Sequence, residues 1–184
     1  MDVSDDILKE AAQGNVEAFE MIYKTYAGFV YNVAFRFLRH EEDAREVSQE
    51  VFWNVYQKLK HFRFESSFKT WIYRITVNHT INYRKKMSRH QAVSYEEHLD
   101  RGQVQENSQL NQEDQTKMVD QLLQHLNPEQ KLCIILRHIQ GLSYEEIAQT
   151  LNVNINTVRT RLNRAREKLL TLKEKVNDEF MRKV

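Results

Sequence analysis

The sequence predicts an all-α fold of two small helical domains, an N-terminal helical bundle and a C-terminal helix-turn-helix domain, joined by a flexible linker. The 184 residues include only 4 Gly and 1 Pro, and 41% are hydrophobic, a composition that favours long helices over turns. Apolar residues recur at helical spacing on both sides of residues 88–115, a polar, Gln-rich and acidic stretch typical of a linker. The predicted domains are therefore residues 1–87 and 116–184.

Capping residues divide the first domain into four predicted helices. Each begins at a residue whose side chain can accept a hydrogen bond from the first turn, or follows a break in the apolar pattern. The first predicted helix is capped by Ser4 and ends at Ala12, and the second is capped by Asn15 and ends at about Leu38. The third runs from about Glu41 to Leu59, and the fourth is capped by Ser66 or Ser67 and ends at about Lys86. The predicted core rows are Phe19, Ile22, Tyr23, Tyr26, Val30, Val33, Ala34 and Phe37, followed by Ala44, Val47, Val51, Val55 and Leu59.

The second domain carries closely spaced helix start and stop signals. A helix is expected over residues 116–126. Asn127 and Gln130 form a predicted capping box around Pro128, and Gly141 is placed to end that helix. A second capping box, Ser143 with Glu146, opens a short helix that leads through a turn at 152–154 into a long helix from about Ile155. Two helices joined by so tight a turn predict a helix-turn-helix.

The last predicted helix is basic. Residues 154–168 hold five basic residues against one acid, Glu167. A charged run is usually a solvated helix face, but the turn and the two capping boxes favour recognition of duplex DNA. The candidate DNA-reading residues are Asn154, Asn156, Thr157, Arg159, Thr160, Arg161 and Arg164.

Charge is distributed in blocks, although the net charge is only +1. Residues 61–90 and 127–184 are net basic, and an acidic stretch separates them, which indicates two anion-binding surfaces. In the first block, aromatic residues alternate with basic ones, a pattern that suits single-stranded nucleic acid. The alternative is a hydrophobic core, which we favour for four of its apolar residues but less for two phenylalanines and two asparagines. The four are Phe68, Trp71, Ile72 and Ile75, and the others are Phe62, Phe64, Asn78 and Asn82.

Nothing in the sequence indicates an enzyme. The third predicted helix carries an acidic outer row, for which docking and plain solvation both remain open. The single Cys133 excludes an internal disulfide and is expected to be a buried structural thiol rather than a nucleophile. No cofactor, metal or small-molecule substrate is expected. No apolar run is long enough to insert in a membrane and the N-terminus is acidic, so a cytoplasmic location is expected.

Four stretches, taken in order, resemble the sigma-70 family of bacterial RNA polymerase sigma factors, in its extracytoplasmic-function group. They are 14–19 (GNVEAF), 43–52 (DAREVSQEVF), 62–78 (FRFESSFKTWIYRITVN) and the helix-turn-helix segment 126–169. Arg45, Ser48, Phe64, Asn82 and Asn156 depart from the residues common in that family. Positions 64 and 156 are the ones where the family often has glycine.

The resemblance implies a non-enzymatic specificity subunit that directs core RNA polymerase to promoter DNA, with an anti-sigma factor as its expected inhibitor. The clamp helices of the largest polymerase subunit would meet Asp43, Glu46, Gln49, Glu50 and Trp53. The minus-10 element would meet Phe62, Arg63, Phe64, Ser66, Lys69, Asn78, Asn82, Arg84 and Lys85. The minus-35 element would meet the DNA-reading residues of the last helix. The alternative is a stand-alone helix-turn-helix regulator with an N-terminal helical interaction domain.

Overall fold

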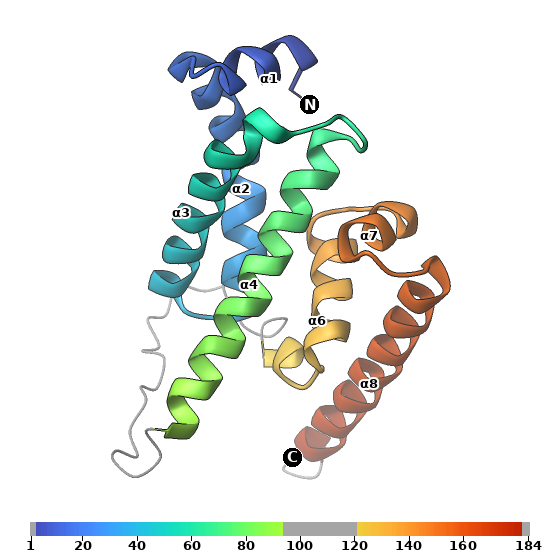
Figure 1. The fold of residues 1–184 in the computed structure, drawn as a ribbon. Helices are drawn as coiled ribbons and strands as arrows, with labels where there is room; N and C mark the ends of the chain where they lie inside the picture. The colour runs from blue at the N-terminus through green and yellow to red at the C-terminus, as the bar shows by residue number, and fades with distance from the viewer. Residues whose placement is uncertain (1–2, 94–120, 182–184) are drawn as a thin grey trace.

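The computed structural model describes residues 3–93 and 121–181, and every regular element in these two ranges is helical, which confirms the all-α prediction (Figure 1). The first range contains α1 (Asp5–Ala12), α2 (Val16–Leu38), α3 (Glu41–Lys58), the 3₁₀ turn η1 (Leu59–His61) and α4 (Phe68–Val93). The second contains α6 (Pro128–Ile134), the π-helical turn η2 (Ile135–Ile139), α7 (Tyr144–Leu151) and α8 (Ile155–Met181). No described helix is long and apolar enough to cross a membrane.

The helix starts follow the predicted capping residues. Asn15 Oδ1 accepts a hydrogen bond from Ala18 N at 3.0 Å, and Ser67 Oγ accepts one from Thr70 N at 3.1 Å. Both capping boxes, Asn127 with Gln130 and Ser143 with Glu146, are formed in full. Ser4 occupies the N-cap position of α1, but its side chain makes no capping hydrogen bond.

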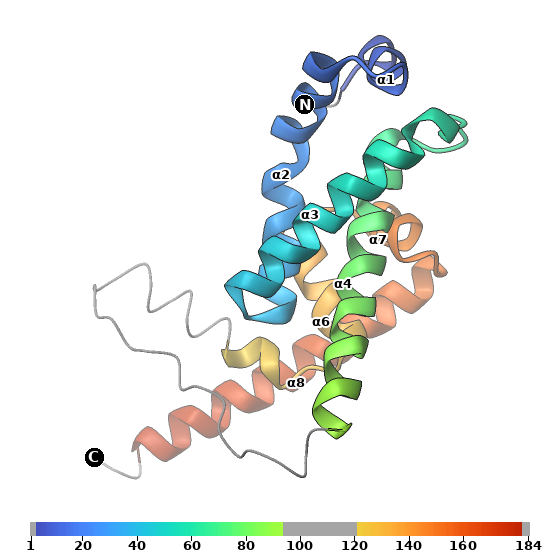
Figure 2. The same cartoon turned by 60° about the vertical axis from the view of Figure 1, so that its left-hand side comes forward.

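Helices α2, α3 and α4 pack side by side as a bundle, and α1 lies across one end of it (Figures 1 and 2). The predicted core rows of α2 and α3 are buried there, with two exceptions at the start of α2. Phe19 is only partly buried, and Tyr23 is 50% exposed, so its placement in the core was wrong. Tyr23 lies at the edge of the contact with α3, where its ring centroid is 4.6 Å from that of Phe52.

Helix α4 is longer than predicted, because it continues to Val93 instead of ending near Lys86. Residues 88–93, assigned to the linker from the sequence, therefore belong to this helix, and the rest of the predicted linker lies outside the described residues. Of the helix predicted over 116–126, residues 121–124 are helical and 116–120 also lie outside the described part.

The helix that starts at Pro128 changes character at its midpoint. Every residue from Lys131 to Leu136 is buried, and within this run the backbone widens at Ile135 into the π-helical turn η2. Gly141, with φ of 70°, ends the helix as predicted, and Leu142 N donates to Leu136 O at 3.0 Å. Buried residues on all sides are consistent with the position of this helix between α2 and α8.

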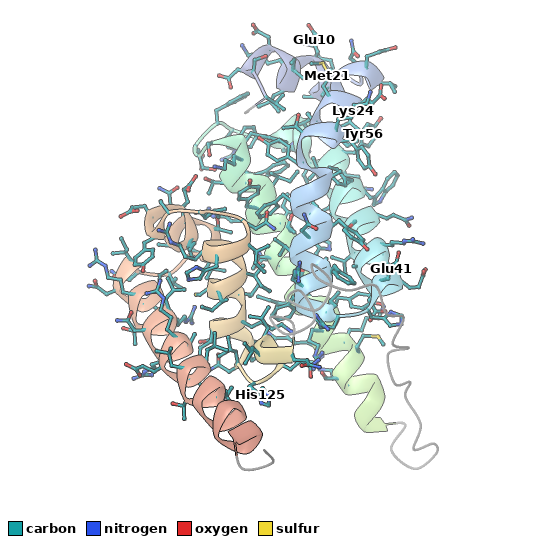
Figure 3. All side chains as sticks on the ribbon, turned by 180° about the vertical axis from the view of Figure 1, so that it is seen from behind. Glu10, Met21, Lys24, Glu41, Tyr56 and His125 are labelled. Atoms are coloured by element: carbon teal, nitrogen blue, oxygen red, sulfur yellow. The ribbon has the colours of Figure 1, made fainter. Side chains whose placement is uncertain are left out.

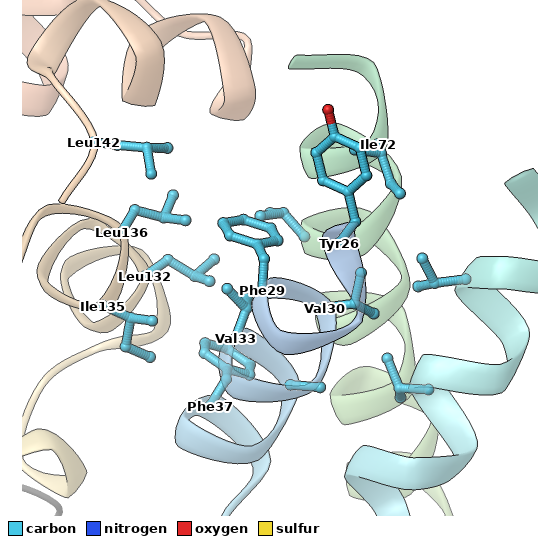
Figure 4. Packing of buried hydrophobic residues seen from close by; sticks show 14 of the residues in the cluster. Tyr26, Phe29, Val30, Val33, Phe37, Ile72, Leu132, Ile135, Leu136 and Leu142 are labelled. Carbon is cyan, nitrogen blue, oxygen red and sulfur yellow. The ribbon is translucent and has the colours of Figure 1, made fainter. Parts of the chain in front are cut away.

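The two helical groups share one hydrophobic core. Phe29, Val33 and Phe37 of α2 face apolar side chains of the second group, in the view of Figure 4. Those side chains are Leu132, Ile135, Leu136 and Leu142. A further contact joins α4 to α7. The described parts of the chain therefore pack against each other directly.

Candidate nucleic-acid interface

The helix-turn-helix is formed by α7, a turn and α8. Asn152 ends α7 with φ of 52°, a left-handed conformation that asparagine tolerates better than most residues. Asn154 Oδ1 accepts a hydrogen bond from Asn156 N at 2.8 Å and so stabilises the start of α8. Val158, Leu162 and Ala165 are buried and fix the orientation of α8, so its opposite face is left to solvent.

The predicted DNA-reading residues lie mainly on that solvent face. Five of them are exposed (Asn154, Asn156, Arg159, Thr160 and Arg164), and Thr157 is half-buried. Arg159 Nη1 donates to Asn156 Oδ1 at 3.1 Å, and Thr160 Oγ1 donates to Asn156 O at 2.9 Å. The leading end of α8 thus presents hydrogen-bonding groups in an arrangement that can meet base edges in a major groove.

Arg161 differs from these neighbours because it is held inside the domain. Its side chain is 22% exposed, and its Nη2 lies 2.7 Å from Glu129 Oε2 near the start of α6. A groove of about 440 Å³ separates the two helix starts, and Arg161, Arg164 and Glu129 are among its lining residues. Arg161 therefore ties α8 to α6 beside the DNA-reading face.

Cys133 lies near this ion pair and is fully buried, so the prediction of a buried thiol is confirmed. Burial raises the pKa of its thiol to about 11. At neutral pH the sulfur is protonated and packs as an apolar group.

An aromatic cluster surrounds the loop between η1 and α4. The ring centroid of Phe62 lies 4.8 Å from Phe64, 5.6 Å from Phe68 and 5.1 Å from Trp71. Phe68 and Ile72 are buried, as expected of core residues, whereas Trp71 and Ile75 are partly buried against the same core. The loop therefore packs on a cluster of aromatic rings.

Phe64 is the exposed edge of that cluster. Its side chain is 46% exposed, and its φ of 56° lies in the left-handed region that favours glycine. A bulky residue in this conformation is strained and is often found where function requires it. Glycine would adopt this backbone conformation without that strain.

Polar and basic residues continue from the loop along α4. Asn78, Asn82 and Lys85 are exposed and recur at helical spacing, so they form one stripe, and Arg84 is exposed beside them. In the loop, Arg63 is exposed and Ser66 is half-buried.

Lys69, at the start of α4, already has a partner. Its Nζ lies 2.7 Å from Glu146 Oε1 of α7. Arg74, which the sequence analysis did not single out, donates from Nε to Gln149 O at 2.6 Å. The only feature of the sequence that pointed to Arg74 was its place among the alternating aromatic and basic residues of α4.

The polymerase-docking residues predicted on α3 are divided between two faces of the helix, and the three acids share one of them. The Tyr83 hydroxyl, on α4, lies within hydrogen-bond distance of Asp43 Oδ1 at 2.9 Å and Glu46 Oε2 at 3.0 Å, and Glu50 Oε2 lies 3.5 Å from His79 Nδ1. Burial, reinforced by the two carboxylates, raises the pKa of Tyr83 above its usual value. These three acids therefore face α4.

Gln49 and Trp53 lie on the other face of α3 and line an apolar groove of about 760 Å³ between α2 and α3. Trp53 is 62% exposed, and Phe19, Tyr23, Phe52 and Tyr56 also line the groove. Met21, Lys24 and Tyr56 lie on the outer side of α2 and α3 in Figure 3. The sequence analysis did not propose Tyr23 or Tyr56 for this surface. The feature that could have indicated them is that both are aromatic residues on neighbouring helices.

Comparison with known proteins assigns the N-terminal and C-terminal helical groups to one family. Residues 22–90 match the family model for sigma-70 region 2, and residues 116–169 match that for sigma-70, region 4. The chain is 33% identical over 172 residues to the ECF RNA polymerase sigma-E factor of Haemophilus influenzae, covering 88% of this chain and 90% of that protein. The chain belongs to the extracytoplasmic-function group of the sigma-70 family. The sigma-E factor of Escherichia coli strain K12 is 34% identical over 176 residues, covering 90% of this chain and 92% of that protein.

Solved structures agree with the fold of this sigma factor. The structure of CnrH in complex with the cytosolic domain of CnrY superposes with a TM-score of 0.71 and 24% identity, covering 94% of this chain and 98% of that one. RpoE of Bartonella quintana, solved with the anti-sigma factor NepR, gives a TM-score of 0.70 and 22% identity, covering 86% and 98%. The two family models and the sigma-E relatives, rather than these structures, show that the protein is an RNA polymerase sigma factor that functions in transcription initiation, and they do not favour the alternative of a stand-alone regulator.

Proposed function

We propose that this sigma factor contacts promoter DNA at two separate surfaces, a duplex-reading surface on α8 and a strand-capturing surface on the 62–66 loop and α4. The main support is the structural difference between them. One presents exposed polar and basic residues at the leading end of a helix-turn-helix, and the other presents an exposed phenylalanine beside a basic helix. The first suits base edges in a major groove, and the second suits unstacked bases and their phosphates.

The minus-35 element is the proposed ligand of α8. Asn156, Arg159 and Thr160 would contact base edges, while Asn154, Thr157, Arg161 and Arg164 position the helix or meet phosphates. Each good bidentate base contact contributes about 1–3 kcal/mol of discrimination. Because Arg161 is already paired with Glu129, its contribution is expected to act partly through the position of α8.

The minus-10 element is the proposed ligand of the loop and α4. A base flipped out of the duplex would stack on Phe64, supported by Phe62, which offsets a flipping cost of a few kcal/mol. Arg63, Ser66, Lys69, Asn78, Asn82, Arg84 and Lys85 would then hold the strand's backbone. Lys69 can do so only after it leaves Glu146.

Core polymerase is the proposed occupant of the apolar groove between α2 and α3. Aromatic residues that are exposed and close together are typical interface anchors, and Trp53 is the most exposed of the ring residues in this groove. Gln49 lies beside it, whereas Asp43, Glu46 and Glu50 would act at the edge, where they already contact α4. The partner would be the clamp helices of the largest polymerase subunit.

An anti-sigma factor is the proposed inhibitor. The support is that two structures with the same fold contain a second protein, the cytosolic domain of CnrY in one and the anti-sigma factor NepR in the other. A cytoplasmic site of action follows from the proposed polymerase partner.

The test is run-off transcription from pooled genomic fragments with core polymerase, followed by sequencing of the transcript starts. The wild-type protein should give starts that share two spaced motifs. Trp53→Ala should weaken binding to core polymerase by more than tenfold, as removal of an interface anchor does. The matched control is Leu170→Ala, which removes another exposed hydrophobic residue far from the groove. Starts without a shared motif, or equal losses in the two variants, would contradict the proposal.

A further inference from the structure

Asn156 lies in the first turn of α8, and both of its hydrogen-bond acceptors are already engaged within that helix. Its side-chain oxygen Oδ1 accepts a hydrogen bond from Arg159 Nη1 at 3.1 Å, and its main-chain oxygen accepts one from Thr160 Oγ1 at 2.9 Å. Its main-chain nitrogen donates to Asn154 Oδ1 at 2.8 Å. Within the described part of the chain, the side-chain nitrogen Nδ2 of Asn156 has no such partner.

These side chains lie on the face of α8 that points away from the protein. Asn156, Arg159 and Thr160 are all exposed, and residues three and four positions apart share one side of a helix. Val158 and Leu162 are buried on the opposite side. Long side chains on a helix point towards its N-terminus, so Arg159 extends back over Asn156, and the bond to Oδ1 holds one edge of the guanidinium there.

The bonded pair of Asn156 and Arg159 can offer DNA only hydrogen-bond donors. Arg159 keeps the N–H groups that do not face Asn156, and Asn156 keeps those of Nδ2. An asparagine with a free amide group can pair with adenine, because it accepts from N6 and donates to N7. Asn156 cannot make that contact while its oxygen holds Arg159.

The four bases differ in the number of acceptors that they present to such a pair. In the major groove guanine presents two acceptors, N7 and O6, whereas adenine and thymine each present one, and cytosine presents a donor. A pair that offers only donors therefore forms two hydrogen bonds with guanine, one with adenine or thymine, and none with cytosine.

We infer that Asn156 is a positioning residue that holds Arg159 for guanine, so that the base that Arg159 meets in the minus-35 element is selected in the order guanine, then adenine or thymine, then cytosine. The inference deepens the proposed function of α8 and rests on it. Without the Asn156 side chain, the long and flexible Arg159 would be free to turn to a phosphate, a contact that carries no sequence information.

Three substitutions separate the positioning of Arg159 from the capping of α8. Asn156→Ala removes the bond to Arg159 but keeps the other two bonds of Asn156, because those use its main chain. Asn156→Asp keeps an oxygen that can accept from Arg159 and loses the Nδ2 donor. The matched control is Asn163→Ala, which removes an exposed asparagine from the same face of α8, two turns further along.

The experiment uses the full chain bound to core polymerase, with a pool of duplex promoter fragments in which the minus-35 element is randomised. Sequencing of the bound and unbound fragments gives the relative affinity for each base at each position. Arg159→Ala identifies the position concerned, because the preference for guanine there should fall about 5- to 150-fold on loss of a bidentate contact.

The Asn156 variants are then compared at that position. Asn156→Ala should lower the guanine preference about two- to tenfold, the range expected for the loss of one hydrogen bond. Asn156→Asp should retain the preference but bind every fragment more weakly, because its negative charge repels the phosphates. Asn163→Ala should retain the preference.

Several results would overturn the inference. One is a guanine preference that survives in Asn156→Ala, or a loss that is spread equally over all positions, since either would leave Asn156 with a role only in the start of α8. Others are an equal loss in Asn156→Asp or Asn163→Ala, a preference for another base at the position that Arg159→Ala affects, or no affected position at all. In each of these cases a wild-type holoenzyme that selects a shared minus-35 sequence keeps the proposed function, whereas one with no preferred base at any position rejects that function as well.

Discussion

Substituting Phe64 separates the strain of its backbone from the function of its ring. Phe64→Ala removes the ring but leaves a β-carbon at φ of 56°, whereas Phe64→Gly removes both. A left-handed conformation costs about 1–2 kcal/mol for a residue with a β-carbon, and the greater freedom of glycine in the unfolded chain offsets about 0.5–1 kcal/mol of that. The glycine variant should therefore be more stable than the alanine variant by about 0.5–1 kcal/mol.

Two assays measure the two effects. Thermal unfolding should give a melting temperature about 1–4 °C higher for the glycine variant than for the alanine variant, given about 2–4 °C per kcal/mol for a chain of this size. Binding of promoter DNA with an opened minus-10 region, in the presence of core polymerase, should weaken in both variants by about 1–3 kcal/mol for the lost stacking. Phe64→Trp is the control that keeps an aromatic face and should preserve binding.

Two outcomes would refute this reasoning. Equal melting temperatures for the alanine and glycine variants would show that the loop relaxes without cost and stores no strain. Unchanged DNA binding in both variants would show that the ring, although exposed, does not contact a base.

Three further predictions concern the helix-turn-helix half. Arg159→Ala should weaken binding to a duplex minus-35 site by about 1–3 kcal/mol without changing the free energy of unfolding in urea. Arg161→Ala should also lower the free energy of unfolding, by up to about 1 kcal/mol, because it breaks the ion pair with Glu129. Equal free energies of unfolding for the two variants would contradict this distinction. Burial, with Arg84 and Arg39 nearby, lowers the pKa of Lys131 to about 8 from 10.5. Between these values the unfolded chain binds more protons than the folded one, so this residue's contribution to stability should rise with pH from about 8 to about 10.5. Urea unfolding across that range should show the rise as the difference between wild type and Lys131→Met, and parallel curves would refute it. Cys133, with its pKa raised to about 11, should react with iodoacetamide at pH 8 far more slowly in the folded protein than in urea, and equal rates would place the thiol at the surface.

Local features of the fold were predictable because they depend on residues three or four positions apart. Asn15, Asn127 and Ser143 each cap a helix through the residue three positions later, and the sequence shows both members of each pair. The core rows of α2 and α3 follow from the same short period. The error at Tyr23 arose because the apolar row is wider than the surface that α3 covers.

The features that periodicity could not reveal depend on residues far apart in the chain. Lys69 and Glu146 are 77 positions apart, and no pattern near either residue predicts that they meet. The same holds for Lys131 and the carbonyl of Phe37, 94 positions away. The residues of the proposed surfaces were recognisable from motifs, but their partners elsewhere in the chain could be found only from the three-dimensional structure.

The helix that runs from Pro128 through η2 has contacts in both halves of the molecule, because its buried residues meet α2 on one side and α8 on the other. An amino-acid change there alters two interfaces at once. Amino-acid substitutions in this segment should therefore accumulate slowly during evolution. Those that do occur should be accompanied by compensating substitutions in α2, even where one helical group alone would tolerate the change. A pairwise survey of natural variants would reveal this constraint as covariation between Leu132 or Leu136 and the α2 residues Phe29 and Val33.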